Sequence, residues 1–305
     1  MKNGHVETTD ILACVCGERL FNDPVVTYDY SYTTCLNSFK FVKCECGSYT
    51  LKNRPIDKEI QNIYPTSYDA YKPTSRRLVQ VVRKVNFKRK VKLVGRFTEI
   101  DSWLDYGCGA GEFPELLKKH GIQGVYAIDS NADVSHKLES LGVFFAETVD
   151  DQIIDCSIDV VSLLQVIEHL PDPEKTILTL SEKMKRGAIL LIETPSPTGF
   201  DFAFGENGTW GGWHAPRHFF VFSKESIVEM LRKSGFEVLK TNFIPSPYLW
   251  AETLKARRIV RKKNKMAGVF TIGNPVFILL IAFIDILRIF LRMSTSNQRI
   301  IARKI

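Results

Sequence analysis

Residues 104–112 read LDYGCGAGE, an apolar strand that ends in an acid, followed by a glycine loop and the start of a helix. Gly107, Gly109 and Gly111 lack a Cβ atom where the turn is tight and where a ligand must approach the backbone. The helix that follows presents free amide groups beside that ligand. Because the spacing is G-x-G-x-G and Asp105 precedes the loop, the pattern favours a ligand with a cationic amino acid part over a pyrophosphate.

Around this loop, residues 99–240 alternate short apolar runs with helical patterns, which predicts an α/β fold with a parallel sheet. Helices are expected between the strands, for example from Gly111 to His120 and from Asp172 to Lys185. The predicted strands are, in order, 99–106, 124–129, 142–147, 157–164, 187–193, 236–243 and 299–304.

Asp129 closes the second predicted strand, in the stretch AIDSN. A carboxylate at this place accepts hydrogen bonds from the two hydroxyls of a ribose. The glycine loop and this acid, at their observed spacing, together indicate a cofactor that contains a nucleoside.

Residues 100–193 resemble the class I methyltransferases, a seven-stranded Rossmann-like family that uses S-adenosylmethionine (SAM). The resemblance rests on the glycine loop, on AIDSN and on IDVVSLLQVIEHLPDP at 158–173. It implies helices on both faces of the sheet, a reversed last strand at 299–304 and SAM as the cofactor. It also implies a set of cofactor-binding residues: Asp105, Gly107, Gly109, Gly111, Asp129, Glu147, Leu164 and Gln165.

Two loops at the carboxyl ends of the predicted strands carry candidate catalytic residues. Methyl transfer to a hydroxyl requires alignment of the reactants and removal of a proton. The segment after the fourth strand supplies Glu168 and His169, and the long aromatic loop 194–223 supplies His214 and His218. The length of that loop favours a functional role. The alternative is a packed lid in which the histidines only form structural hydrogen bonds.

The stretch VIEH at 166–169 resembles the acid–histidine pair of divalent-metal-dependent O-methyltransferases, such as those of ubiquinone biosynthesis and of small-RNA 3′ ends. This resemblance implies a metal held by Glu168, His169 and either His214 or His218, which would lower the pKa of an acceptor hydroxyl. Gln165 stands where those families carry another acid. Simple general-base use of a histidine is therefore the preferred expectation, ahead of a divalent metal.

Five of the seven cysteines lie within the first 46 residues, which points to a metal site more than to disulfides. The stretch PRHFFVFSKESI at 216–227 resembles a subgroup of bacterial polysaccharide and lipid-glycan methyltransferases that often begins with a small zinc ribbon. The pairs here are C-x-C-G, shorter than the usual C-x-x-C-G. Two such pairs can still provide a closed four-thiolate site for structural zinc, from Cys14, Cys16, Cys44 and Cys46.

The chain divides by pattern into a cysteine-rich domain at 1–70, a basic linker helix at 71–98 and a methyltransferase domain at 99–305. The last of these contains an insertion at 244–298 that is first basic and then strongly apolar. Polar and charged residues interrupt the apolar run, so a single spanning helix is not expected. The pattern suits contact with a membrane interface and, equally, a dimer interface or packing over the core.

The apolar and charged fractions, 45% and 25%, are those of a globular protein. The polar N-terminus predicts a cytoplasmic protein. Membrane contact through residues 256–291 would place it at the inner membrane face. O-methylation of a sugar or lipid-linked glycan is the leading expectation. The net charge of +7 gathers in two basic clusters that suit phosphates, so an RNA 2′-O-methyltransferase is one alternative. A non-catalytic SAM-binding scaffold is another, because a fold does not determine its function.

Overall fold

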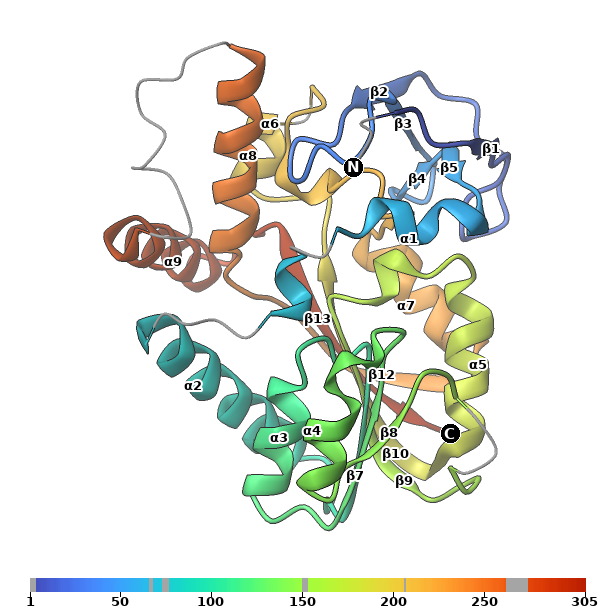
Figure 1. Ribbon diagram of the computed structural model, residues 1–305, viewed down its shortest axis with the longest axis vertical. Helices are drawn as coiled ribbons and strands as arrows, with labels where there is room; N and C mark the ends of the chain where they lie inside the picture. Colours follow the sequence, from blue (N-terminus) through green and yellow to red (C-terminus); the bar gives the residue numbers. More distant parts are fainter. Residues whose placement is uncertain (1–3, 66–67, 73–76, 150–152, 206, 262–273) are drawn as a thin grey trace.

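The computed structural model describes residues 4–65, 68–72, 77–149, 153–205, 207–261 and 274–305 (Figure 1). Its main sheet has seven strands in the order β12-β13-β10-β9-β6-β7-β8. Neighbouring strands pair in parallel, except that β13 runs antiparallel to both β10 and β12. The expected reversed last strand is therefore confirmed. The strands, in sheet order, are Phe236–Phe243, Asn297–Lys304, Met184–Pro195, Ile158–Leu164, Ser102–Tyr106, Gly124–Ile128 and Phe144–Ala146.

Helices cover both faces of this sheet, as predicted (Figure 1). Successive side chains of a strand point to opposite faces, so Leu190 and Leu191 of β10 belong to two separate core clusters. One cluster packs under α2 (Arg77–Val94), α3 (Glu112–Lys119) and α4 (Ser135–Ser140). The other packs under α5 (Pro173–Lys183) and α7 (Lys224–Lys233). The expected linker helix is thus α2, a shorter span than 71–98.

Two helix starts follow directly from the sequence. The Asp172 side chain accepts a hydrogen bond from the amide of Lys175, and Pro173 occupies the first turn of α5. Ser223 caps α7 by accepting from the amide of Ser226. The shorter elements are η1 Asp57–Glu59, α1 Ile60–Ile63, η2 Asp69–Tyr71, η3 Ala132–Val134, η4 Ile167–His169, α6 Phe200–Gly205 and η5 Gly211–Trp213.

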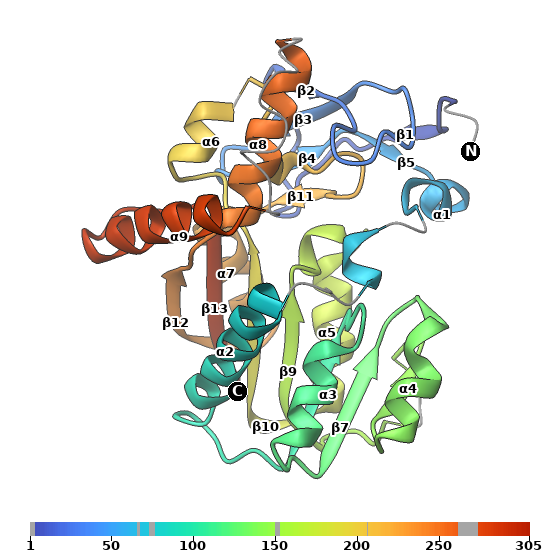
Figure 2. The same cartoon turned by 60° about the vertical axis from the view of Figure 1, so that its left-hand side comes forward.

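The cysteine-rich segment forms two small sheets beside the carboxyl end of the main sheet (Figure 2). Strand β1 (Thr8–Asp10) pairs with β5 (Asn53–Pro55). A second sheet has the order β11-β4-β3-β2. Its strands are β11 (Phe220–Val221), β4 (Tyr49–Leu51), β3 (Phe39–Lys43) and β2 (Pro24–Thr27). Strand β11 comes from the loop before α7. The second small sheet therefore contains strands from both sides of the domain boundary predicted at residue 70.

In the sequence between β12 and β13, the described residues form two helices, α8 (Pro247–Val260) and α9 (Pro275–Phe290). They pack on each other through Trp250 and Ala251 on α8 and Phe277 and Ile281 on α9. Residues 262–273, part of both the basic and the apolar stretch of the expected insertion, lie outside the described residues. Over the described part of the chain, no helix combines the length and the apolar character needed to cross a bilayer.

Candidate active site

A cavity of about 740 Å³ lies at the carboxyl ends of β6, β7, β8 and β9. The N-terminal segment closes its other side with Tyr64, Tyr68 and Tyr71. A volume of this size suits a nucleoside cofactor with part of an acceptor. Five of the eight predicted cofactor-binding residues line the cavity: Gly107, Gly109, Asp129, Glu147 and Gln165.

The glycine loop lies directly under the N-terminal segment. The amide of Ala110 donates a hydrogen bond to the Ala70 carbonyl at 2.8 Å. Gly109 has a φ of +54°, and a Cβ atom at this position would lie 2.6 Å from the same carbonyl oxygen. A side chain at position 109 would therefore be strained and would push the two segments apart.

Asp129 lies between the glycine loop and the turn after β7. Its Oδ2 accepts a hydrogen bond from the amide of Gly109 at 2.7 Å, and its Oδ1 accepts from the amide of Asn131 at 2.9 Å. Burial raises the pKa of this carboxyl. The two amides hold the carboxylate at the cavity wall, where the ribose of a nucleoside cofactor is expected.

Asp105, Gly111 and Leu164 lie outside the lining of the cavity, so their cofactor contacts stay predictions. Asp105 lies beneath the loop, where it accepts a hydrogen bond from the Ser162 hydroxyl at 2.6 Å and where burial raises its pKa to about 7. Gly111 caps α3 with a φ of +69°. Leu164 packs against the core cluster under α2, α3 and α4.

The four predicted catalytic residues come together next to the cavity. The imidazole centroids of His169 and His218 are 4.6 Å apart, and those of His214 and His218 are 4.9 Å apart. Glu168 Oε1 lies 4.0 Å from His218 Nε2. Within this group His169 lines the cavity, and the other three lie outside its lining.

Burial controls the protonation of this cluster. It lowers the pKa of His169 to about 4 and lowers those of His214 and His218 well below the ordinary value. The three imidazoles are therefore neutral at pH 7. Burial also raises the pKa of Glu168 to about 8, although the Thr194 hydroxyl donates a hydrogen bond to its Oε2 at 2.9 Å.

Backbone carbonyls select the tautomers of two of these histidines. His218 Nδ1 lies 2.8 Å from the Gly212 carbonyl oxygen, and His169 Nδ1 lies 3.0 Å from that of Arg217. A carbonyl only accepts, so both Nδ1 atoms carry the proton, and the Tyr64 hydroxyl oxygen, 3.1 Å from His169 Nδ1, lies on the accepting side of that contact. Both Nε2 atoms consequently keep a lone pair for a proton or a metal ion.

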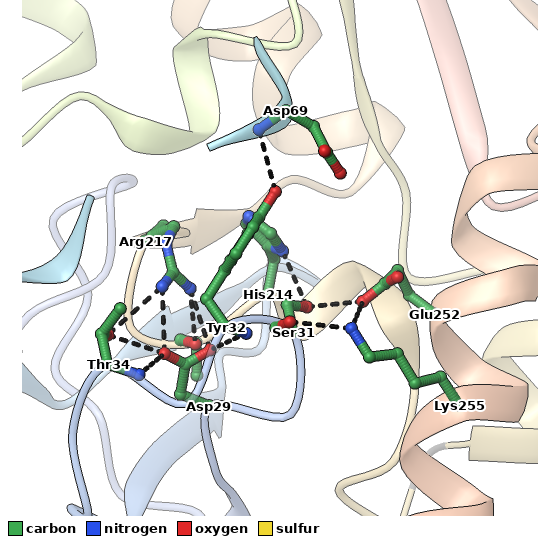
Figure 3. Close-up of polar contacts among 10 residues, drawn as sticks. Asp29, Ser31, Tyr32, Thr34, Asp69, His214, Arg217, Glu252 and Lys255 are labelled. Atoms are coloured by element: carbon green, nitrogen blue, oxygen red, sulfur yellow. Dashed lines mark hydrogen bonds and ion pairs between the residues drawn. The ribbon is translucent and has the colours of Figure 1, made fainter. Parts of the chain in front are cut away.

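A serine selects the tautomer of the third histidine (Figure 3). The Ser31 hydroxyl donates its one hydrogen to Glu252 Oε2 at 2.7 Å. Its oxygen therefore accepts from His214 Nδ1, 3.3 Å away, which leaves Nε2 of His214 unprotonated. Lys255 lies 3.7 Å from the same Glu252 oxygen and donates to the Ser31 carbonyl at 2.7 Å.

A buried ion pair joins the cysteine-rich segment to the histidine loop (Figure 3). Arg217 donates from Nη1 and Nη2 to the two Asp29 carboxylate oxygens at 3.1 and 3.0 Å, and both side chains are fully buried. Burial alone would raise the pKa of Asp29, but hydrogen bonding and attraction to Arg217 leave it lowered. The guanidinium also stacks on Tyr32 at 4.6 Å. The pair holds residues 29–34 against the loop that carries His214 and His218.

The four cysteines predicted to bind metal also come together, with their Sγ atoms all within 4.8 Å of one another. Both pairs form the same turn, because the Gly17 and Gly47 amides donate to the Cys14 and Cys44 carbonyls, each at 2.9 Å. Those glycines have φ values of +90° and +85°. The short C-x-C-G spacing thus still forms two matching knuckles. Four thiolates in such an arrangement fit structural zinc.

We expect Cys44→Ser to remove zinc from the purified protein and to lower its thermal midpoint by several degrees, since a structural zinc site contributes folding energy. Metal analysis and thermal unfolding measure the two effects. Cys156→Ser is the matched control, because Cys156 is exposed and outside the cluster. A wild-type protein without zinc, with an unchanged midpoint for Cys44→Ser, would contradict the zinc site.

Several residues of the site were not predicted from the sequence. Tyr64, Tyr68 and Tyr71 follow one another at intervals of four and three residues, a regular spacing that could have signalled one aromatic wall. Ser31 and Glu252 had no such signal, because they lie 183 and 38 positions from His214 in the sequence and meet only in the fold.

Known proteins similar to this chain are methyltransferases. A ubiquinone biosynthesis O-methyltransferase of Coxiella burnetii is 28% identical over 162 residues, covering 48% of this chain and 65% of that protein. One from Hahella chejuensis is 33% identical over 110 residues, covering 33% of this chain and 46% of that protein. The chain thus spans less than two thirds of the length of these relatives.

Solved structures of methyltransferases are also similar. A SAM-dependent methyltransferase from Archaeoglobus fulgidus is 23% identical with a TM-score of 0.48, covering 74% of this chain and 94% of that one. The profile of the methyltransferase domain family matches residues 73–241, more than half of the chain. The protein therefore belongs to the methyltransferase domain family.

Proposed function

We propose that this protein transfers the methyl group of SAM to a hydroxyl of a sugar or lipid-linked glycan, at the inner face of a membrane. The observation that carries the proposal is the cluster of three neutral histidines and one buried glutamate beside the cavity. Such a cluster suits an acceptor that must lose a proton, as a hydroxyl does. The names of the relatives, which are O-methyltransferases, support oxygen as the methylated atom.

The cavity walls fit SAM. Gly107 and Gly109 open the backbone to the ligand, and Asp129 offers its carboxylate to the ribose hydroxyls. Tyr64, Tyr68 and Tyr71 provide aromatic surfaces that attract a cation. When bound, SAM supplies a methyl group on a positively charged sulfur.

In this proposal a histidine takes the proton of the acceptor hydroxyl. His169 lines the cavity, the His218 ring meets the His169 ring edge-on, and the His214 ring lies tilted beside that of His218. Each presents an unprotonated Nε2. With SAM bound, methylation of the acceptor oxygen would leave the cofactor without its methyl group, and a histidine nitrogen would hold the hydroxyl proton.

A divalent metal is a second candidate for activating the hydroxyl. Glu168, His169 and His218 each offer one ligand atom, all within 4.8 Å of one another. Among the residues that the structure describes, none is within hydrogen-bonding reach of Glu168 Oε1, although this atom is buried. An unpartnered buried oxygen beside two imidazoles fits a cation. Such an ion would lower the pKa of the acceptor hydroxyl.

Incubation with radiolabelled SAM and a cell extract, separated afterwards into lipid, polysaccharide and RNA, tests the acceptor class. Label in the lipid or polysaccharide fraction would support the proposal. Label in RNA would support the alternative, which rests on α2, a helix with no acidic residue and many basic ones. No label in any fraction would leave the family assignment standing and would favour a SAM-binding scaffold.

Asp129→Asn is expected to weaken SAM binding by about 100-fold or more, because the ribose loses a charged acceptor for two hydrogen bonds. Calorimetry measures the affinity, and circular dichroism checks the fold. Asp133→Asn is the control, since Asp133 is exposed in the turn just after Asp129. An affinity equal to that of the control would refute the ribose role of Asp129.

A further inference from the structure

The side of α9 that faces solvent is strongly apolar. Phe283 is 63% exposed and Phe290 is 82% exposed. The exposed residues recur at intervals of three and four, so they lie along one face of the helix. We define the outer face of α9 by Val276, Leu279, Leu280, Phe283, Ile286, Leu287 and Phe290.

The opposite side of α9 is fastened to the protein. Phe277 and Ile281 pack on Trp250 of α8. Asp285, one turn further along, is buried and accepts a hydrogen bond from the Ser246 amide at 2.8 Å. These contacts prevent the helix from turning its outer face inward. A contiguous row of exposed apolar side chains marks an interaction site.

The charged residues near the outer face of α9 indicate the chemistry of its partner. The one acid in the α9 sequence, Asp285, is the buried residue, and the exposed Arg292 follows the helix. Helix α2 lies on the same side of the molecule (Figures 1 and 2) and has no acidic residue. It exposes Lys84 and Lys88 beside Val81 and Val85. Basic and apolar groups together suit an anionic lipid surface, whereas a second copy of the chain would bring like charges together.

We propose that the outer face of α9 docks this protein on an anionic lipid bilayer, with the basic residues of α2 at the headgroups. Helix α9 packs on α8. Helix α8 carries Glu252, which accepts the hydrogen bond from the Ser31 hydroxyl beside His214. It also carries Thr253, whose hydroxyl accepts a hydrogen bond from the Gly211 amide at 2.8 Å. Docking therefore brings the lipid surface to the helix that supports the active site. The delivery of a lipid-linked acceptor rests on the proposed function, whereas the docking itself does not.

Sedimentation with vesicles, without SAM or acceptor, tests the docking. The vesicles are phosphatidylcholine alone or phosphatidylcholine with about one third phosphatidylglycerol. We expect the wild-type protein to sediment with the anionic vesicles, and Leu280→Glu/Phe283→Glu/Phe290→Glu to lower the partition coefficient by at least about tenfold. The matched control changes three exposed apolar residues of the cysteine-rich segment, Leu12→Glu/Phe21→Glu/Leu36→Glu.

A second variant, Lys84→Glu/Lys88→Glu, is expected to reduce binding to the anionic vesicles only. The docking is overturned if the wild-type protein stays in solution with both kinds of vesicle. It is also overturned if the α9 variant binds like the control, or if light scattering shows a dimer that this variant splits and vesicles do not bind. Vesicle binding combined with label in RNA would uphold the docking and reject the glycan acceptor, so the two proposals fail separately.

Discussion

Arg217→Met is expected to lower the free energy of unfolding at pH 7 by about 3–5 kcal/mol, because it leaves the buried Asp29 carboxylate without its counter-charge. Both side chains are fully buried. The amides of Tyr32 and Thr34 still donate to Asp29, at 3.0 and 2.8 Å, but they carry no net charge. Urea unfolding followed by circular dichroism measures the loss.

Two comparisons identify the cause of this loss. Asp29→Asn/Arg217→Met is expected to recover part of it, because the double variant buries no charge. Arg83→Met removes a partly exposed ion pair with Glu112 and is expected to cost less than about 1 kcal/mol. An equal effect of Arg217→Met and Arg83→Met would show that the buried pair does not hold the two segments together.

The effect of Arg217→Met also depends on pH. The pKa of Asp29 is lower in the folded protein than its ordinary value of 3.8. The stabilisation by the pair is therefore present above pH 3.8 and is lost as the pH falls through the lower, folded-state pKa. The difference between wild type and Arg217→Met should accordingly shrink in strong acid.

The main sheet was predictable because its strands are nearly continuous apolar runs between glycines and helix caps. All seven expected strands are found, and their ends differ by a few residues. The largest difference is in β10, which spans Met184–Pro195 rather than 187–193 and passes through an irregularity before Ile189. Gly187, with a φ of +82°, lies in that irregularity, so a glycine expected to start the strand instead bends it.

The shared small sheet was not predictable in the same way. Strand β11 has only two residues, and its partner β4 lies about 170 positions earlier in the chain. Such a short segment shows no alternation of its own. Its position depends on long-range contacts such as the hydrogen bond from the Leu51 amide to the Phe219 carbonyl at 2.9 Å. Pairings of this kind belong to the fold and leave no local pattern.

For the candidate site, too, some features were predictable from the sequence and others depend on the fold. Residue type and position at strand ends were enough to nominate Glu168, His169, His214 and His218, since polar groups there converge on one edge of the sheet. Their protonation was not accessible from the sequence, because it depends on burial and on the Gly212 and Arg217 carbonyls. The choice of His218 over His214 as a third metal ligand likewise depends on distance.

His218→Ala is expected to lower turnover by about 10²–10⁴-fold while SAM affinity stays within a factor of about two. His218 lies next to both Glu168 and His169, so its loss removes either a general base or a metal ligand. Single-turnover methylation and SAM calorimetry measure the two quantities. His120→Ala is the control, because His120 is exposed at the end of α3.

Assays before and after treatment with a chelator separate the two roles of His218. A histidine that acts as a simple base keeps its activity without a metal, whereas a metal held by Glu168, His169 and His218 makes turnover depend on added cation. His214 is outside that ligand set, so His214→Ala should slow turnover without changing the cation dependence. If both His218→Ala and His214→Ala methylate at the wild-type rate, these two histidines are structural, and the hydroxyl proton leaves through His169 or another group.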